Sequence, residues 1–185
     1  ETYPNALRSE QAYEYLINIY LNTKNYRAAI ASLETTMSMD KRFKKVYQQL
    51  VYNLAVEQFA SGQYYNSIET FDQSLTRPED KTLAALANYW KADAYYRERI
   101  FHKAIQAYQD FMYEPRAILL PEFYLAHYGT AYSYFQKKDY AQAASWFRKF
   151  LAYKEADSLR TNDALIRTGD CYFIQKEYLV ALEYY

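Results

Sequence analysis

The chain has 185 residues and equal numbers of basic and acidic residues, 22 of each, so its net charge is zero. Proteins that bind nucleic acid normally carry a basic surplus that displaces counterions from phosphate, so this balance argues against that class. Apolar residues make up 51% and aromatic residues 19%, with 24 Tyr but only 3 Gly and 4 Pro, which favours helices around a substantial core. No apolar run approaches the roughly 20 residues of a membrane span, so we expect no direct membrane insertion.

The order of elements along the chain is a succession of helix pairs joined by polar turns such as Ser61-Gly62-Gln63. No alternating run rich in Val, Ile and Thr predicts a strand. The expected first helices cover residues 4–22, 42–60, 79–97, 122–137 and 158–175, and the second helices cover 26–39, 64–75, 101–113, 140–153 and 178 to the end.

Each predicted second helix repeats one pattern, in which an aromatic residue is followed by a small residue at three positions and a large one at seven. The small residues are Ala29, Ser67, Ala104, Ala143 and Ala181, which are 38, 37, 39 and 38 positions apart. Twelve positions before them stand Ile17, Ala55, Ala92, Ala131 and Gly169. Antiparallel helices approach closely only where small side chains face each other. These pairs therefore predict the crossing points of five helix hairpins, with a wider crossing at Ile17.

The stretches Tyr89-Trp90-Lys91-Ala92-Asp93-Ala94-Tyr95-Tyr96 and 139–147 carry the pattern most clearly, and the chain resembles the tetratricopeptide repeat family. The resemblance covers all five units, although their period exceeds the usual unit of about 34 residues. It implies an all-α, right-handed superhelical solenoid of five antiparallel hairpins, each burying its apolar faces on the next. We expect one domain over residues 1–185, with repeats over about 4–39, 42–75, 79–113, 122–153 and 158–185, the last truncated.

Two further expectations concern the wider context of the chain. The last helix is short and ends on apolar residues, which predicts that the chain is part of a longer protein. The long joints between hairpins are similar to those of bacterial envelope members of the family. That narrower resemblance favours a periplasmic or outer-membrane-associated location, with a cytoplasmic location as the alternative.

The predicted binding surface is the inner face of the solenoid, which in this family is lined by the first helices. Its positions carry aromatic residues and scattered charges, which suit an extended or helical peptide. Each aromatic residue is equally compatible with packing between repeats. The predicted partner-binding residues are Tyr52, Phe59, Tyr89, Asp93, Tyr96, Arg97, Tyr128, Tyr132, Phe135, Asp170 and Phe173.

We therefore expect a non-catalytic scaffold that binds a peptide or protein segment in this aromatic groove. The alternative is a structural module that forms a permanent homo-oligomeric or interdomain contact. Some members of the family grip a C-terminal carboxylate with a Lys–Asn pair on the first helices. The matching positions here carry no such pair, which argues against an adaptor for chaperone tails.

Catalytic residues, cofactors and metal ligands are not predicted. His102 follows a turn and is expected to be exposed, whereas His127 lies within a first helix and is expected to be packed. The two lie in different repeats with no Cys or acid at ligand spacing, so a metal site is not expected. Cys171 is expected to act as a small hydrophobe, and three scattered glycines cannot form a phosphate loop.

Two joints carry specific expectations. The hydroxyl of Thr76 is expected to cap the helix that follows, with Pro78 in its first turn. Ile118 and Leu119, which lie between two prolines, are expected to plug the gap between the third and fourth repeats. The alternative for these two residues is an exposed contact for a partner or a second copy.

Overall fold

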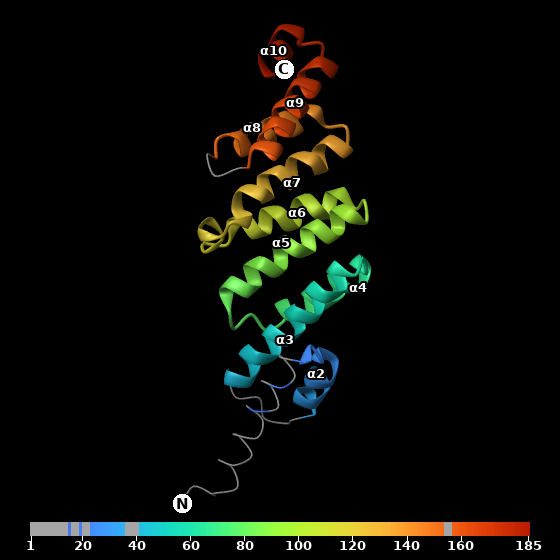
Figure 1. Cartoon of the computed structure of the whole chain (residues 1–185), viewed down its shortest axis with the longest axis vertical. Coiled ribbons are helices and arrows are strands. Elements are labelled where there is room, and N and C mark those ends of the chain that lie inside the picture. The colour runs from blue at the N-terminus through green and yellow to red at the C-terminus, as the bar shows by residue number, and fades with distance from the viewer. Residues whose placement is uncertain (1–14, 16–18, 20–22, 36–40, 154–156) are drawn as a thin grey trace, which may run out of the picture. The chain divides into compact units, whose positions relative to one another are not determined.

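A computed structural model of the chain describes residues 15, 19, 23–35, 41–153 and 157–185. Within these ranges the regular structure is helical, which confirms the all-α prediction (Figure 1). The first helix of the first hairpin, including Ile17, lies outside the described residues apart from Tyr15 and Ile19. The helices are α2 (Tyr26–Glu34), α3 (Lys41–Ala60), α4 (Tyr64–Leu75), α5 (Lys81–Arg97), α6 (Phe101–Tyr113), the 3-10 helix η1 (Ala117–Leu119), α7 (Glu122–Gln136), α8 (Tyr140–Leu151), α9 (Ser158–Ile174) and α10 (Tyr178–Tyr184).

The chain divides into two compact units, residues 1–84 and 85–185. In the first unit α3 packs against both α2 and α4. In the second unit the residues of α5 share a core with α6, and each later helix packs against the next, from α6 through to α10. Consecutive packing of this kind is that of an all-α helical repeat solenoid, because no hairpin buries its apolar faces alone.

The small residues at the predicted crossings are buried. Ala92 and Ala104 lie fully buried in one core cluster of the second unit. Ala131 and Ala143 are fully buried in another. The small side chains let the two helices of a hairpin approach closely, which is the arrangement that the twelve-residue spacing predicts.

The turn inside each hairpin has a feature that the repeat pattern does not predict. Two positions before each second helix stands a residue with positive φ, between 56° and 78°. In the later turns the backbone makes the paired hydrogen bonds that close a helix end, such as Asp139 N–H to the Tyr134 carbonyl at 3.0 Å. Glycine is the usual residue at such a position, yet glycine occurs in only one of the five turns. The five residues are Lys24, Gly62, Arg99, Lys138 and Lys176.

The predicted cap of α5 is wrong. The Asp80 carboxylate caps the helix instead, accepting a hydrogen bond from the Thr82 N–H at 2.9 Å. The Thr76 hydroxyl donates to a carbonyl in the last turn of α4 at 2.7 Å, and Pro78 precedes α5. Asp80 holds the cap position because the buried Gln48 fixes its backbone, donating to the Asp80 carbonyl at 3.0 Å and accepting from its N–H at 2.6 Å.

The expectation for the joint after α6 is also wrong. Ile118 and Leu119 are 68% and 82% exposed, so they do not plug the gap between repeats. Ala117 is fully buried instead, and Leu120 packs against the same core cluster. A 3-10 helix has about three residues per turn, so positions 117 and 120 share a side of η1 and turn the intervening residues outward.

Candidate functional site

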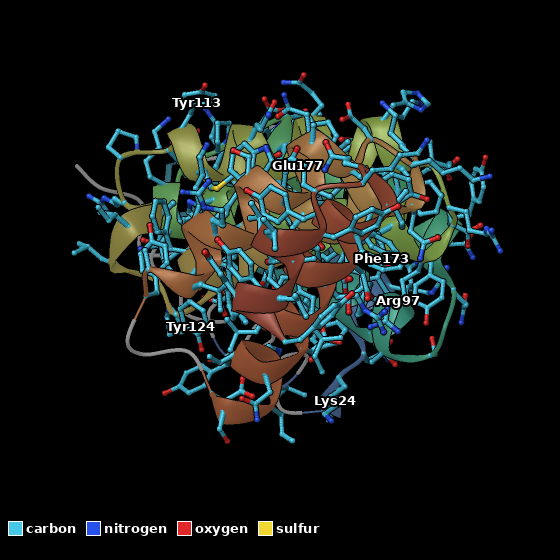
Figure 2. The ribbon with its side chains drawn as sticks, turned by 90° about the horizontal axis from the view of Figure 1, so that it is seen from above. Lys24, Arg97, Tyr113, Tyr124, Phe173 and Glu177 are labelled. Atoms are coloured by element: carbon cyan, nitrogen blue, oxygen red, sulfur yellow. The ribbon has the colours of Figure 1, made fainter. Side chains whose placement is uncertain are left out.

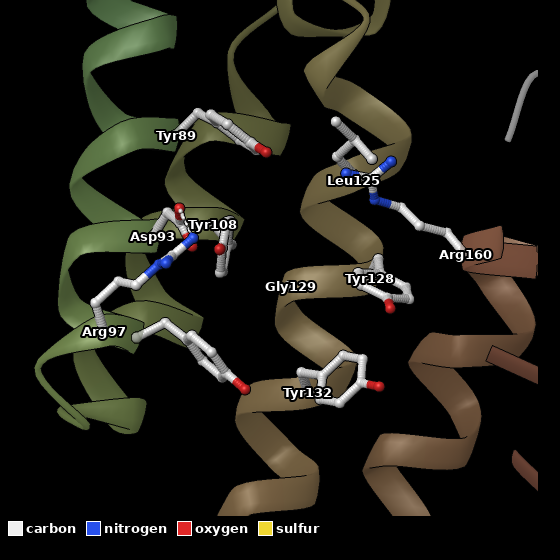
Figure 3. Close-up of a pocket in the computed structure, with 10 residues that line it drawn as sticks. Tyr89, Asp93, Arg97, Tyr108, Leu125, Tyr128, Gly129, Tyr132 and Arg160 are labelled. Atoms are coloured by element: carbon white, nitrogen blue, oxygen red, sulfur yellow. Dashed lines mark ion pairs between the residues drawn. The ribbon is translucent and has the colours of Figure 1, made fainter. Parts of the chain in front are cut away.

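A cavity of about 410 Å³ lies in the second unit, within the range of roughly 300–1,000 Å³ that is typical of ligand pockets. Figure 3 shows its wall from α5 facing the wall from α7, with Arg160 reaching toward it from α9. We call this cavity the tyrosine pocket. Its lining residues are Tyr89, Asp93, Tyr96, Arg97, Tyr108, Leu125, Tyr128, Gly129, Tyr132 and Arg160.

Six of the eleven predicted partner-binding residues line this one pocket. On α5 they recur at spacings of four, three and one, which places them along one stripe of the helix. On α7 they are four positions apart and therefore also share a face. The six residues are Tyr89, Asp93, Tyr96, Arg97, Tyr128 and Tyr132. Whether they bind a partner stays a prediction.

Three other predicted residues belong to the second unit but lie outside the pocket lining. The Phe135 ring contacts the Tyr132 ring, with centroids 6.4 Å apart. Asp170 pairs with Arg167 at 2.8 Å. The Phe173 side chain is largely exposed and packs its ring edge-on against a neighbouring tyrosine. The structure therefore does not bring these three side chains into the pocket.

The two remaining predicted residues belong to the first unit, where each contacts a ring of its own hairpin. The Tyr52 ring lies 5.9 Å from that of Phe71. The Phe59 ring lies 5.3 Å from that of Tyr64. The alternative that the sequence left open for such residues is packing between repeats, whereas both of these contacts lie within one hairpin, between α3 and α4.

One contact between α6 and α7 shapes the floor of the pocket. A Cβ atom placed on Gly129 would lie 2.4 Å from Cζ of Tyr108. Glycine at this position therefore allows the Tyr108 ring to pass directly against the α7 backbone. The Tyr108 ring is buried and lies edge-on to Tyr89, with centroids 5.9 Å apart. Its hydroxyl interacts with the Asp93 carboxylate and acts to lower the pKa of that carboxyl.

Asp93 is the carboxylate of the pocket wall. Its side chain is 21% exposed and lies 3.5 Å from a guanidinium nitrogen of Arg97, one helical turn away on α5. Burial raises the pKa of Asp93, and the Arg97 charge and the Tyr108 hydroxyl act in the opposite direction. Burial also raises the pKa of Tyr108, so its hydroxyl stays a neutral donor.

The α7 wall is held by a polar network with α9. The Tyr128 hydroxyl donates to Asp163 at 2.7 Å, and the Tyr132 hydroxyl bonds to the same oxygen. Arg167 lies 3.6 Å from Asp163 and balances part of its charge. The Tyr128 ring also packs on that of Phe150, with centroids 5.0 Å apart. The two tyrosines therefore line the pocket and also support the packing of α7.

Four lining residues were not among the predicted partner-binding residues. Gly129 offered a signal, because an isolated glycine inside a helical pattern often marks close packing. Tyr108 is the large residue of the pattern in its second helix, seven positions after Phe101, and that pattern carries no prediction of partner binding. Leu125 and Arg160 offered no sequence signal, because Arg160 comes from a later repeat. In the structure Arg160 pairs with Asp157 at 2.5 Å.

Other chemistry in the described ranges is sparse. No cluster of His, Cys, Asp and Glu there has the makings of a metal site. His102 is exposed, and His127 is buried with Nδ1 2.9 Å from the Phe123 carbonyl oxygen. Cys171 is buried, which raises its thiol pKa to about 12 and removes its nucleophilic character. Among the helices that the structure describes, none is both long and apolar enough to cross a bilayer.

Comparison with known proteins identifies the repeats. A family model described as tetratricopeptide repeat matches residues 52–116 and 112–158, which together exceed half of the chain. Among solved structures, the fold is similar to BtubC from P. vanneervenii, with a TM-score of 0.67 and 13% identity over 94% of this chain and 76% of that one.

Two further structures have the same fold. MamA from Desulfovibrio magneticus RS-1 superposes with a TM-score of 0.62 and 13% identity, over 94% of this chain and 89% of that one. PilF from Pseudomonas aeruginosa superposes with a TM-score of 0.60 and 18% identity, over 96% and 73%. Identities this low show the fold alone. A search of curated proteins finds no match.

Proposed function

The chain belongs to the tetratricopeptide repeat family, whose members generally serve as non-catalytic scaffolds for protein–protein interaction, and we propose that it binds a peptide segment in the tyrosine pocket. The observation that carries this proposal is the convergence of residues from three hairpins around one cavity of about 410 Å³. A cavity of this size suits side chains of a short extended or helical segment better than the surface of a folded domain.

The lining has the composition of a binding surface. Five of its ten residues are tyrosines, which give large contact area with little rotamer entropy to lose on binding. Their rings are already held by contacts such as that between Tyr89 and Tyr108 and by the hydrogen bonds to Asp163. A preorganised wall of this kind lowers the entropic cost of binding.

A peptide library displayed on phage and selected against the chain tests the proposal. Tyr96→Ala removes an aromatic side chain from the pocket. The variant should bind a selected peptide about 2 kcal/mol more weakly, a roughly 30-fold rise in Kd. The matched control is Tyr113→Ala, because Tyr113 is 83% exposed and projects away from the ribbon (Figure 2). Circular dichroism checks that both variants fold. Equal binding by the two variants, or no enriched peptide, would refute the proposal.

A second function, a permanent contact with another copy or domain, is favoured by the surface of α10. Leu182 is 68% exposed, whereas Ala144, at the equivalent position of α8, is buried. Leu179 is 82% exposed as well, so α10 carries an apolar face with no cover among the described residues. Such patches often mark interfaces. A dimer that persists on dilution and becomes monomeric in Leu182→Glu, seen by light scattering, would support this function. A monomer at all concentrations would exclude the homo-oligomer.

A further inference from the structure

The proposed function leaves the chemistry of the peptide open, and the following inference rests on that function. We propose that the tyrosine pocket accepts a cationic side chain, an arginine or lysine of the bound segment, held by tyrosine rings and the Asp93 carboxylate. The segment's charged group would lie beside Asp93 and its aliphatic stem against the rings.

The orientation of the tyrosines supports a cation with an apolar stem. The hydroxyls of Tyr128 and Tyr132 are bonded to Asp163. The Tyr108 hydroxyl interacts with Asp93, and the Tyr96 hydroxyl interacts with Gln136. With these hydroxyls engaged by groups of the chain, the rings offer mainly their carbon surfaces to a ligand. The faces of aromatic rings attract cations within about 6 Å, and the stem of Lys or Arg packs on the same apolar surface.

The Asp93 carboxylate supplies the negative charge. It is only 21% exposed, so its charge is poorly screened by water, and its ion pair with Arg97 is long at 3.5 Å. The Arg97 side chain is half-exposed. Its guanidinium shows that such a group fits against Asp93 inside this pocket. A cation from a ligand would share that position or replace the Arg97 guanidinium there.

The wider charge distribution also favours a cation. Among the described residues, five carboxylates bear on the pocket or on its α9 support, against four guanidinium groups. Three of the four guanidinium groups are already near a carboxylate of this chain, so the local balance is acidic. The carboxylates are Asp93, Glu122, Asp157, Asp163 and Asp170, and the guanidinium groups are those of Arg97, Arg99, Arg160 and Arg167.

Capped pentapeptides with a single variable side chain test the inference directly. The probes are acetyl-Gly-Gly-X-Gly-Gly-amide with arginine, norleucine or glutamate at X, titrated into the chain while the amide resonances of Gly129 and Tyr96 are followed by NMR. We expect the arginine probe to bind with a Kd of roughly millimolar strength. The norleucine probe should bind about tenfold more weakly, and the glutamate probe should not shift these resonances.

Three variants separate a cation site from an anion site. Asp93→Asn should lower the affinity for the arginine probe about tenfold. Asp110→Asn, which neutralises an exposed acid on α6, should leave that affinity unchanged. Arg97→Gln removes the resident competitor and should tighten the arginine probe about threefold. If the pocket instead binds anions, Arg97→Gln would weaken the glutamate probe and Asp93→Asn would strengthen it.

The pH dependence gives an independent readout. The groups that face Asp93 are Arg97, Tyr89 and Tyr96 on α5 and Tyr108 on α6. Guanidinium and phenol groups do not titrate between about pH 4 and pH 7. Binding of the arginine probe should therefore fall as the pH falls through the raised pKa of Asp93, because the protonated carboxyl no longer pairs with a cation. Asp93→Asn should remove this dependence.

Several results would overturn the inference. These are tighter binding of the glutamate probe, equal binding of the norleucine and arginine probes, or no shift of Gly129 with any probe. A library-selected peptide that lacks basic residues but loses affinity in Tyr96→Ala would overturn the cationic specificity and leave the proposed function intact. The absence of any enriched peptide would overturn both.

Discussion

Gly129→Ala perturbs the contact on which the floor of the tyrosine pocket depends. The added methyl group would lie 2.4 Å from Cζ and 2.5 Å from the hydroxyl oxygen of Tyr108. Both distances are well below van der Waals contact, so the ring must move. Tyr108 is buried and its hydroxyl interacts with Asp93, and a displaced ring would lose that interaction and intrude on the pocket.

Two effects of opposite sign set the size of the change in stability. Overpacking in a well-packed core costs about 1–3 kcal/mol. Replacing Gly by Ala inside a helix contributes about 1 kcal/mol in the favourable direction. The expected result is a net loss of about 1 kcal/mol of unfolding free energy, together with loss of peptide binding.

Urea unfolding followed by tryptophan fluorescence measures this loss. The chain has two tryptophans, Trp90 and Trp146, and both belong to the unit of residues 85–185 that contains the pocket. The fluorescence signal therefore reports on the affected unit. A double-mutant cycle with Tyr108→Leu isolates the contact, because Gly129→Ala should become neutral or stabilising once the ring is gone. A gain of stability from Gly129→Ala in the native background, with unchanged peptide binding, would refute the reasoning.

Further predictions concern packing, backbone strain and ionisation. Ala104→Leu should lower the unfolding free energy by about 1–3 kcal/mol, measured in urea, because Ala104 is fully buried at a hairpin crossing. Lys138→Gly should raise it by about 1 kcal/mol in the same assay, since Lys138 has a φ of 63°, a region unfavourable for residues with a side chain. The Cys171 thiol, whose pKa burial raises to about 12, should not react with a disulfide reagent at mildly alkaline pH until urea unfolds the chain. Burial lowers the pKa of His127, so the unfolded chain takes up that proton first and stability measured against pH should fall as the pH drops through about 6.5.

Each of these predictions has a control. Ala141 is exposed on α8, so Ala141→Leu should leave the unfolding free energy unchanged. An equal loss of unfolding free energy in Ala104→Leu and Ala141→Leu would contradict the close packing of Ala104 at the hairpin crossing. Gly62→Ala should destabilise, because Gly62 has the same backbone conformation, with φ at 78°. Rapid labelling of Cys171 in native conditions would show that it is accessible. His127→Gln should flatten the pH dependence, and a variant that retains the full slope would assign it to other groups.

The sequence predicted those parts of the fold that depend on local patterns. Hairpin spacing, the starts of the second helices and the buried crossings all follow from small and aromatic residues repeated along one helix face. The same periodicity placed six pocket residues on two helix stripes. The cap of α5 could not be predicted in this way, because Asp80 is selected over Thr76 by Gln48, 32 residues earlier in the chain. Cap propensity alone does not contain that information.

The remaining features of the pocket depend on contacts between repeats. Tyr128 and Asp163 are 35 positions apart, and Arg160 comes from the next hairpin, so no single helix pattern pairs them with the pocket. The positive φ of residues such as Lys138 could not be predicted from the sequence, because the turn geometry common to all five hairpins imposes a backbone conformation that Lys does not prefer.

The most direct test of peptide binding in the tyrosine pocket is photo-crosslinking. A library-selected peptide carrying a benzophenone side chain is irradiated with the chain, and the labelled residues are identified by mass spectrometry. We predict labels on the pocket faces of α5 and α7, among them Tyr96 and Leu125. Labels confined to the exposed face of α10, at Leu179 and Leu182, or to residues 41–75 would contradict this function.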